Sequence, residues 1–326
     1  MSDQYPAEIF TRHLTSPDDK AKQEVDKQNK PGHRPGRQDE FELKPIDDIY
    51  ANGKPYRGSG KLEGKVAWIS GGDSGIGRAT AILFAIEGAD CTIVHVGQEE
   101  KDAQDTRDYI LKKTNGERKV HLVQADLKSE AECKRSVDEC IKSFGRLDVL
   151  VNNHAQQLEN RDVTTLDSKQ WEETFTVNFH SYFYIVKAAL PHMKKGSSII
   201  NMASINAFIG RPDLLDYTST KGALVSFTRG LSNQILGERQ IRVNAIAPGP
   251  VWTPLVPSTF SKENISSFDS TPMGRPGQPV EVATCCVFLA SEDSSFISGN
   301  TVSYQYQYTV RYPIFSHLDR YIQTVA

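Results

Sequence analysis

Residues 66–77 read VAWISGGDSGIG, an apolar run that leads into a glycine-rich turn. Four consecutive apolar residues predict a buried strand, and helical spacing follows over residues 79–89. Glycine permits positive φ angles and has no Cβ that would block a ligand. The start of the helix directs unpaired N–H groups at the turn, which suits a pyrophosphate. The stretch therefore predicts the first unit of a nucleotide-binding α/β fold.

Outward from this stretch, short apolar runs alternate with segments of helical spacing. This alternation predicts a parallel sheet covered on both faces. The fold class is therefore α/β, a single Rossmann-type doubly wound sheet of about seven strands. The predicted strands are 66–69, 91–96, 120–124, 147–151, 198–202 and 241–245. The predicted helices are 79–89, 99–113, 131–144, a long pattern that ends near 193, 217–236 and 280–290.

Composition divides the chain into three regions. Residues 1–60 form a polar N-terminal arm without apolar periodicity, 61–302 the nucleotide-binding domain, and 303–326 an atypical tyrosine-rich tail. The alternation at the start of the tail fits a seventh strand. Two interpretations of the arm stay open, a disordered tail and an arm that wraps a neighbouring subunit. Its candidate anchors are Phe41, Leu43, Ile46, Ile49 and Tyr50.

The composition of the whole chain excludes several classes of function. The net charge is −3 and no long basic run occurs, which argues against nucleic acid or an anionic membrane as the main partner. We find no apolar stretch long enough to span a bilayer and no secretory signal. The five cysteines have no metal-ligand spacing, so we expect no metal site and a reducing, cytoplasmic setting.

Tyr217 and Lys221 are the strongest candidates for chemistry. They are four residues apart, so they share one face of the predicted helix 217–236. A tyrosine ionises near pH ~10, and a neighbouring ammonium lowers the pKa of the phenol. Ser204 follows the predicted strand 198–202 and supplies a hydroxyl upstream of the pair. The pattern predicts a phenol that transfers protons.

Several motifs in a fixed order together resemble the short-chain dehydrogenase/reductase family. The filling GDS at 72–74 and the polar arm narrow the resemblance to glucose/ribitol dehydrogenase-like and general-stress oxidoreductases, over roughly residues 61–299. The motifs are Ser70-Gly71-x-x-x-Gly75-Ile76-Gly77, Asn152-Asn153-x-Ala155, Ser204, Tyr217-x-x-x-Lys221, Arg242-Val243-Asn244 and Pro248-Gly249-Pro250-Val251.

The resemblance implies four catalytic residues, Asn178, Ser204, Tyr217 and Lys221. Tyr217 exchanges a proton with the substrate oxygen while a hydride moves to or from the nicotinamide. Ser204 binds that oxygen, Lys221 lowers the pKa of Tyr217 and holds the ribose, and Asn178 kinks its helix and holds a water. The implied function is an NAD(P)-dependent oxidoreductase that acts on an alcohol or carbonyl of a sugar, polyol or aldehyde.

The resemblance also implies a nicotinamide dinucleotide and a homo-oligomer, a dimer or tetramer. The second predicted strand ends without an acidic residue to bind the ribose, which leans slightly to NADP, but no arginine is there and Glu99 and Glu100 follow. NADP and NAD both stay open. The implied cofactor residues are Gly71, Ser74, Gly75, Ile76, Gly77, Asp126, Asn152, Tyr217, Lys221, Pro248, Gly249, Val251 and Thr253.

Around this site the sequence offers several further hypotheses. His154 replaces a small residue of the family pattern, so it either narrows or polarises the site or is a tolerated change. We expect a substrate lid over 255–273. Trp252 and Phe208 are candidate pocket walls. The candidate polar contacts to a hydroxylated substrate are Asn206, His154 and Gln157.

Two other functions remain as alternatives to the oxidoreductase. The altered tail favours a cofactor-binding but inactive redox sensor or scaffold, whereas the intact Ser204, Tyr217 and Lys221 argue against it. Epimerase or dehydratase chemistry on a nucleotide sugar fits the pair of Tyr217 and Lys221 less well, and that branch usually has a longer substrate domain and a different glycine spacing. The tail departs from the family pattern after Gly299, as a splice variant or an error in the gene model would produce.

Overall fold

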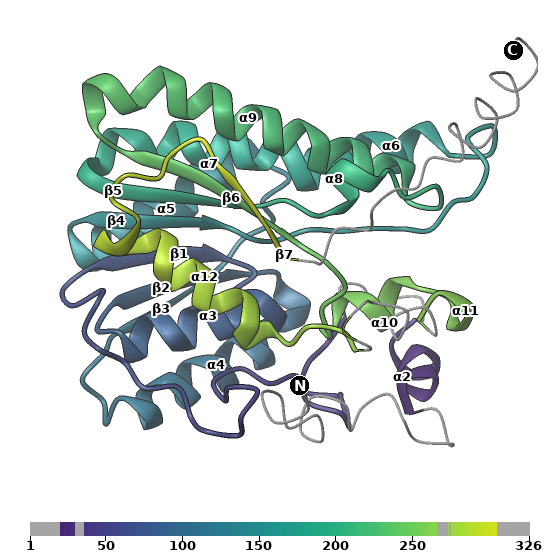
Figure 1. Cartoon of the computed structure of the whole chain (residues 1–326), viewed down its shortest axis with the longest axis horizontal. Helices are drawn as coiled ribbons and strands as arrows, with labels where there is room; N and C mark the ends of the chain where they lie inside the picture. Colours follow the sequence, from purple (N-terminus) through teal and green to yellow (C-terminus); the bar gives the residue numbers. More distant parts are fainter. Residues whose placement is uncertain (1–19, 30–35, 266–272, 274, 305–326) are drawn as a thin grey trace, which may run out of the picture.

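A parallel sheet of seven strands forms the centre of the molecule, in the order β3-β2-β1-β4-β5-β6-β7 (Figure 1). The computed structural model describes residues 20–29, 36–265, 273 and 275–304. The order reverses direction between β1 and β4, which is where dinucleotides bind in such sheets. The strands are β1 Val66–Ser70, β2 Asp90–His95, β3 Val120–Gln124, β4 Leu147–Asn152, β5 Met193–Met202, β6 Arg242–Pro248 and β7 Thr301–Tyr304.

Helices cover both faces of the sheet, and each face has its own apolar core. One core joins the sheet to α3 and α12, and the other joins it to α5, α7 and α9 (Figure 1). The doubly wound architecture is therefore confirmed. The α-helices are α2 Lys20–Gln28, α3 Gly75–Ile86, α4 Glu100–Lys113, α5 Glu130–Phe144, α6 Ser168–Phe175, α7 Ser181–Ala189, α8 Asn206–Ile209, α9 Leu215–Arg239, α10 Leu255–Thr259, α11 Lys262–Ile265 and α12 Pro279–Ala290.

The seventh strand comes from the segment that departs from the family pattern. β7 pairs in parallel with β6, with Thr301 opposite Ala245 and Tyr304 opposite Pro248. The strand therefore runs two residues past the predicted domain end at 302. The rest of the predicted tail, 305–326, lies outside the described residues.

The described part of the arm packs on its own chain. Phe41 is 3% exposed and meets the ring of Trp252 edge to face, with 5.9 Å between centroids. The backbone of Ile46 accepts a hydrogen bond from the N–H of Val280 on α12. Of the five predicted anchors, Ile49 and Tyr50 are exposed instead. The arm is thus part of the domain surface, because its apolar residues find partners far along the chain.

Among the described helices, none is long and apolar enough to cross a membrane. All five cysteines are buried and free of disulfides. Within the same residues no group of His, Cys, Asp and Glu side chains is arranged to hold a metal ion.

Candidate active site

The turn between β1 and α3 has a backbone that favours glycine. Gly71 and Gly75 have φ angles of 60° and 51°, in the left-handed region. A Cβ on Gly77 would lie 1.9 Å from the carbonyl oxygen of Gly71. The sequence signal at these three glycines therefore has a steric cause, and Ile76 lies between two of them at the start of α3.

Asn153 holds this turn in place. Its side-chain amide donates to the carbonyl oxygens of Ser70 and Gly71, at 3.0 and 3.1 Å, and its N–H donates to the hydroxyl of Ser70. The predicted residue Asn152 is fully buried instead and donates to Asn201 on β5. The contact with the turn thus belongs to the next residue of the same motif, because side chains alternate along a strand.

A second segment lies against the glycine turn. Thr253 is 8% exposed, and its side chain would lie 3.1 Å from a Cβ on Gly75. The N–H of Gly277 donates to the carbonyl of Pro250 and fixes the turn that follows β6. Of the predicted residues of this turn, the structure therefore brings Thr253 to the glycines. Pro248, Gly249 and Val251 precede it in the same turn.

Asp126 and Ser74 show no cofactor-specific arrangement of their own. Asp126 is exposed at the end of β3, and its carboxylate accepts from the N–H of Lys128 at 3.1 Å. Ser74 stands at the N-cap of α3 with an extended backbone and no capping bond from its side chain. An aspartate that closes its own turn is also the ordinary structural role of that residue type.

Three carboxyl groups gather where β1 and β2 end. Burial raises the pKa of Asp73, and burial together with repulsion from Asp73 and Asp102 raises that of Glu99 well above its usual value. Burial raises the pKa of Asp102 to about 6. Burial thus disfavours negative charge at each of these three carboxyl groups. The sequence placed Glu99 after the strand but did not indicate that it is buried.

Ser204, Tyr217 and Lys221 meet at the carboxyl end of β5. Ser204 lies two residues after the end of β5, and the Lys221 ammonium nitrogen lies 5.4 Å from the Tyr217 ring centroid. That ammonium also donates to the carbonyl of Met202 at 2.8 Å. Lys221 is 1% exposed and Tyr217 8%. The predicted catalytic residues are thus brought together in a nearly dry environment.

The electrostatics of the pair differ from the sequence prediction. Burial raises the pKa of Tyr217 to about 12, and the Ser204 hydroxyl opposes this only in part. Burial lowers the pKa of Lys221 to about 7. The prediction that Lys221 lowers the Tyr217 pKa is wrong for the chain alone, because desolvation acts against the charged form of both groups.

Asn178 lies in a π-helical turn, Thr176–His180, between α6 and α7. Its carbonyl oxygen accepts from the N–H of Gln156, and its amide donates to the carbonyl of Gln156 and to Thr220 on α9. This agrees with the expectation that the long helix is interrupted at Asn178. The side chain joins the segment after β4 to the helix that carries Tyr217.

Asp216 and Thr220 support the pair and were not predicted from the sequence. The buried Asp216 carboxylate accepts from Gln170 and Thr174 on α6. Thr220 bonds both the carbonyl of Tyr217 and the Asn178 amide. An acid directly before the catalytic tyrosine, in the first turn of α9, was the available signal.

His154 belongs to the interior. Its two ring nitrogens bond the hydroxyls of Ser70 and Ser181, at 2.7 and 2.9 Å. Burial lowers the pKa of His154 to about 3, so the ring is neutral. The hypothesis that His154 contacts the substrate is therefore not supported, because both of its polar atoms are used within the fold.

The other pocket hypotheses have mixed outcomes. Gln157 is 5% exposed and donates to Thr259, so it ties α10 of the predicted lid to the sheet. Trp252 is fully buried beneath the arm and forms no wall. Phe208 is 51% exposed on α8, and Asn206 follows Ser204 closely enough for its N–H to donate to the serine hydroxyl.

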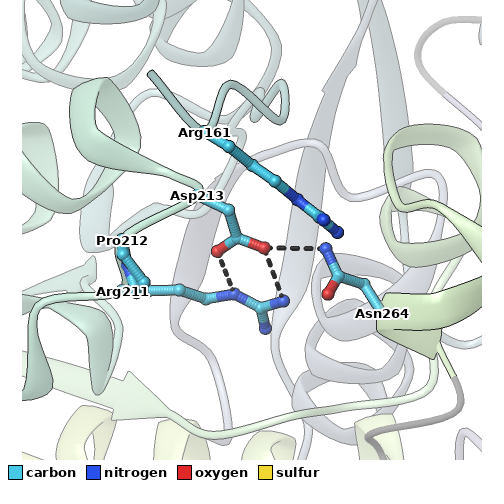
Figure 2. Close-up of a pocket in the computed structure, with 5 residues that line it drawn as sticks. All are labelled: Arg161, Arg211, Pro212, Asp213 and Asn264. Atoms are coloured by element: carbon cyan, nitrogen blue, oxygen red, sulfur yellow. Dashed lines mark hydrogen bonds and ion pairs between the residues drawn. The ribbon is translucent and has the colours of Figure 1, made fainter. Parts of the chain in front are cut away.

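A polar pocket of about 420 Å³ lies beside the predicted lid. It is lined by Arg161, Arg211, Pro212, Asp213 and Asn264. Figure 2 shows the Asp213 carboxylate paired with Arg211 and bonded to Asn264, while Arg161 reaches toward the same amide. Leu214, which follows Asp213 directly, packs in one apolar cluster with Tyr217. The pocket therefore lies close in sequence to Tyr217, but Tyr217 does not line it.

These features suit a dinucleotide. The glycine turn leaves a cradle that a Cβ at Gly77 would fill, and Thr253 lies against its other side. Buried Lys221 offers an ammonium beside Tyr217, where a ribose hydroxyl would find a donor. The residues therefore fit a nicotinamide dinucleotide, with its phosphates at the glycine turn.

Comparison with known proteins agrees with this geometry. Residues 71–305 match the family model described as enoyl-(acyl carrier protein) reductase. The chain is 48% identical to NADPH-dependent aldehyde reductase 1, chloroplastic, of Arabidopsis thaliana, over 82% of this chain and 93% of that protein. It is 49% identical to glucose and ribitol dehydrogenase of Daucus carota, over 76% and 86%. A short-chain dehydrogenase from Burkholderia cenocepacia in complex with NADP superposes with a TM-score of 0.70 at 27% identity, over 75% and 98%.

Proposed function

The chain belongs to the short-chain dehydrogenase/reductase family, and from that premise we propose how its own residues transfer hydride and protons. The protein is an oxidoreductase that uses a nicotinamide dinucleotide. The single observation that carries the proposal is the buried Lys221 ammonium 5.4 Å from the Tyr217 ring centroid. The Ser204 hydroxyl acts on the same phenol and lowers its pKa in part. A hydroxyl pair of this kind can hold one substrate oxygen from two sides.

In the proposed reaction, a bound nicotinamide would supply the hydride chemistry at the carbon of an alcohol or carbonyl. The Tyr217 hydroxyl gives a proton to the carbonyl oxygen during reduction and takes one from the alcohol during oxidation. The Ser204 hydroxyl donates to the same oxygen and fixes its position. Lys221 binds the ribose hydroxyls and returns the proton to Tyr217, while Asn178 keeps α9 in register with the segment after β4.

The cofactor residues of the proposal follow from the two segments that form the cradle. The glycine turn with Ser74 and Ile76 would hold the phosphates, and Thr253 with the turn after β6 would hold the nicotinamide amide. We keep the slight lean to NADP, because no acidic residue ends β2 and burial disfavours negative charge on the carboxyls that follow it. For Asp126 and Asn152 we propose an indirect role, in which they support this end of the sheet and do not contact the cofactor.

For the substrate we propose a sugar, polyol or aldehyde. The names of the relatives support this class, and so does the polar pocket beside the lid, whose arginine and asparagine side chains suit hydroxyl groups. We also propose a partner and a location. We expect a homo-oligomer in the cytoplasm, and exposed Phe183 on α7 offers apolar surface for assembly.

The experiment that tests this function is a panel of aldehydes, polyols and sugars run with NADP(H) and NAD(H). Turnover is followed by the absorbance of the reduced nicotinamide, and kcat/KM is compared between the two cofactors. We expect reduction of at least one aldehyde or oxidation of one polyol. If the chain binds the dinucleotide yet turns over no member of the panel, the inactive sensor or scaffold becomes the better account.

A further inference from the structure

A segment of the N-terminal arm lies along the cofactor cradle, and we call residues 36–44 the strap. At one end a Cβ on Gly36 would lie 2.2 Å from the carbonyl oxygen of Pro254, directly after Thr253. Further along the strap, the N–H groups of Gln38 and Asp39 donate to the two carboxylate oxygens of Asp102, at 2.8 and 2.7 Å. The strap therefore runs from the turn after β6 to the first turn of α4, across the end of the sheet.

Between these two contacts, Gln38 reaches the glycine turn. Its side-chain carbonyl accepts from the N–H of Gly75 at 2.8 Å, and the residue is 6% exposed. The backbone carbonyl of Gln38 accepts from the Lys44 ammonium at 2.7 Å. Asp102 and Lys44 thus fix the backbone of Gln38, from which its side chain reaches Gly75.

The start of α3 keeps donors that Gln38 does not use. The N–H of Gly75 points to Gln38, and that of Arg78 donates to the carbonyl of Ser74. Within the described part of the chain, the N–H groups of Ile76 and Gly77 have no acceptor. A helix start with two remaining donors can bind a phosphate while the glutamine stays in place.

The far end of the strap is fixed in the protein core. The Trp252 indole N–H donates to the carbonyl of Leu43 at 2.9 Å, and Phe41 packs on the same indole. Phe41, Trp252 and Tyr217 belong to one apolar cluster. These contacts make displacement of the strap costly, since it would expose a buried phenylalanine and an indole.

We propose that the strap lies over the bound dinucleotide and that Gln38 is a positioning residue, which orients the phosphate turn through the Gly75 N–H. This inference rests on the cofactor use of the proposed function and extends it to a segment outside the dinucleotide fold. The strap and the phosphates would both bind the start of α3. The strap accepts from the N–H of Gly75, and the phosphates would accept from those of Ile76 and Gly77. The arm is then part of the cofactor site.

The test compares Gln38→Met with wild type in the full-length protein. Methionine keeps the length of the side chain and removes the acceptor oxygen, so it frees the turn without a large cavity. We expect Kd for NADPH, from the fluorescence of the bound nicotinamide, to rise about five- to tenfold. At saturating cofactor, kcat changes less than about twofold, because the catalytic group is untouched.

The matched control is Lys54→Met, which also introduces a methionine, at an exposed residue of the same arm. Its Kd should equal that of wild type. An unchanged Kd in Gln38→Met contradicts the positioning role, and tighter binding contradicts it too, since it shows that the glutamine competes with the phosphate. A wild-type chain that binds neither dinucleotide contradicts the proposed function instead, so the two failures are distinguishable.

Hydrogen exchange on the wild-type protein gives a second readout that needs no variant. We expect the amides of residues 36–44 to exchange more slowly once NADPH saturates the protein, because the strap closes over the ligand. Faster exchange in this segment on cofactor binding shows that the strap is displaced, and that result overturns the proposal.

Discussion

The pair of Tyr217 and Lys221 shows how burial competes with charge at a catalytic residue. The sequence predicts an ammonium that lowers the pKa of a phenol, and the structure places the two side chains together. In the chain alone, however, burial favours the neutral form of each group. It raises the pKa of Tyr217 to about 12 and lowers that of Lys221 to about 7. The spacing of residues predicts contact, but the extent of desolvation depends on the packing of the whole fold.

Lys221→Met should stabilise the cofactor-free protein more at low pH than at high pH. The native pKa of Lys221 is about 7, below its unfolded value, so from pH 7 upward the unfolded chain binds more protons. Stability of the wild type therefore rises with pH by up to about 1.4 kcal/mol per unit over this range. The stabilisation in Lys221→Met, measured by urea unfolding, should be about 2 kcal/mol larger at pH 6 than at pH 9.

Lys54→Met serves again as the control, because Lys54 is exposed and its replacement should not change the pH dependence. An equal effect of Lys221→Met at both pH values would show that the lysine titrates normally in the native state.

At the scale of single elements, the strands of the sheet were the most predictable part. Strands buried on both faces read as continuous apolar runs, and 66–69 and 147–151 lie within β1 and β4. β5 instead begins at Met193, ahead of the predicted 198, because residues 194–196 are exposed and lack an apolar signal. Periodicity predicted the long helix that precedes β5. It did not predict the π-helical turn 176–180, which depends on the hydrogen bonds of the buried Asn178.

Asn178→Leu should lower the free energy of unfolding by about 2 kcal/mol. The substitution leaves both the N–H and the carbonyl of Gln156 without their partner in the fold. Chemical denaturation of the variant measures the loss, with Thr220→Val as a companion that removes one of the same contacts. If Asn178→Leu unfolds at the wild-type denaturant concentration, the π-helical turn does not depend on these bonds.

For the molecule as a whole, the arm is the part that the sequence could not place. Its apolar residues have no periodicity, and their partners lie far along the chain, as in the bond between Leu43 and Trp252. The candidate site is more local in its signals, since glycine spacing and the Tyr217–Lys221 pair both act within a turn of helix. Gln38 carries no such signal, because its meaning depends on the path of the strap.

Phe41→Ala should destabilise the protein by about 3 kcal/mol, because it removes a buried ring from the cluster with Trp252. Since Phe41 packs on its own chain, the loss in urea unfolding should not depend on protein concentration. A destabilisation that grows on dilution would place Phe41 in a neighbouring subunit, as one interpretation of the sequence had it.

The most direct test of the account is Tyr217→Phe, assayed for turnover and for cofactor affinity in the same preparation. Phenylalanine keeps the ring beside Lys221 and removes only the phenolic hydroxyl. We predict an unchanged Kd for NADPH and a fall in kcat of at least about a hundredfold, as expected when a general acid and base is lost. Turnover close to that of the wild type would contradict the assignment of proton transfer to Tyr217.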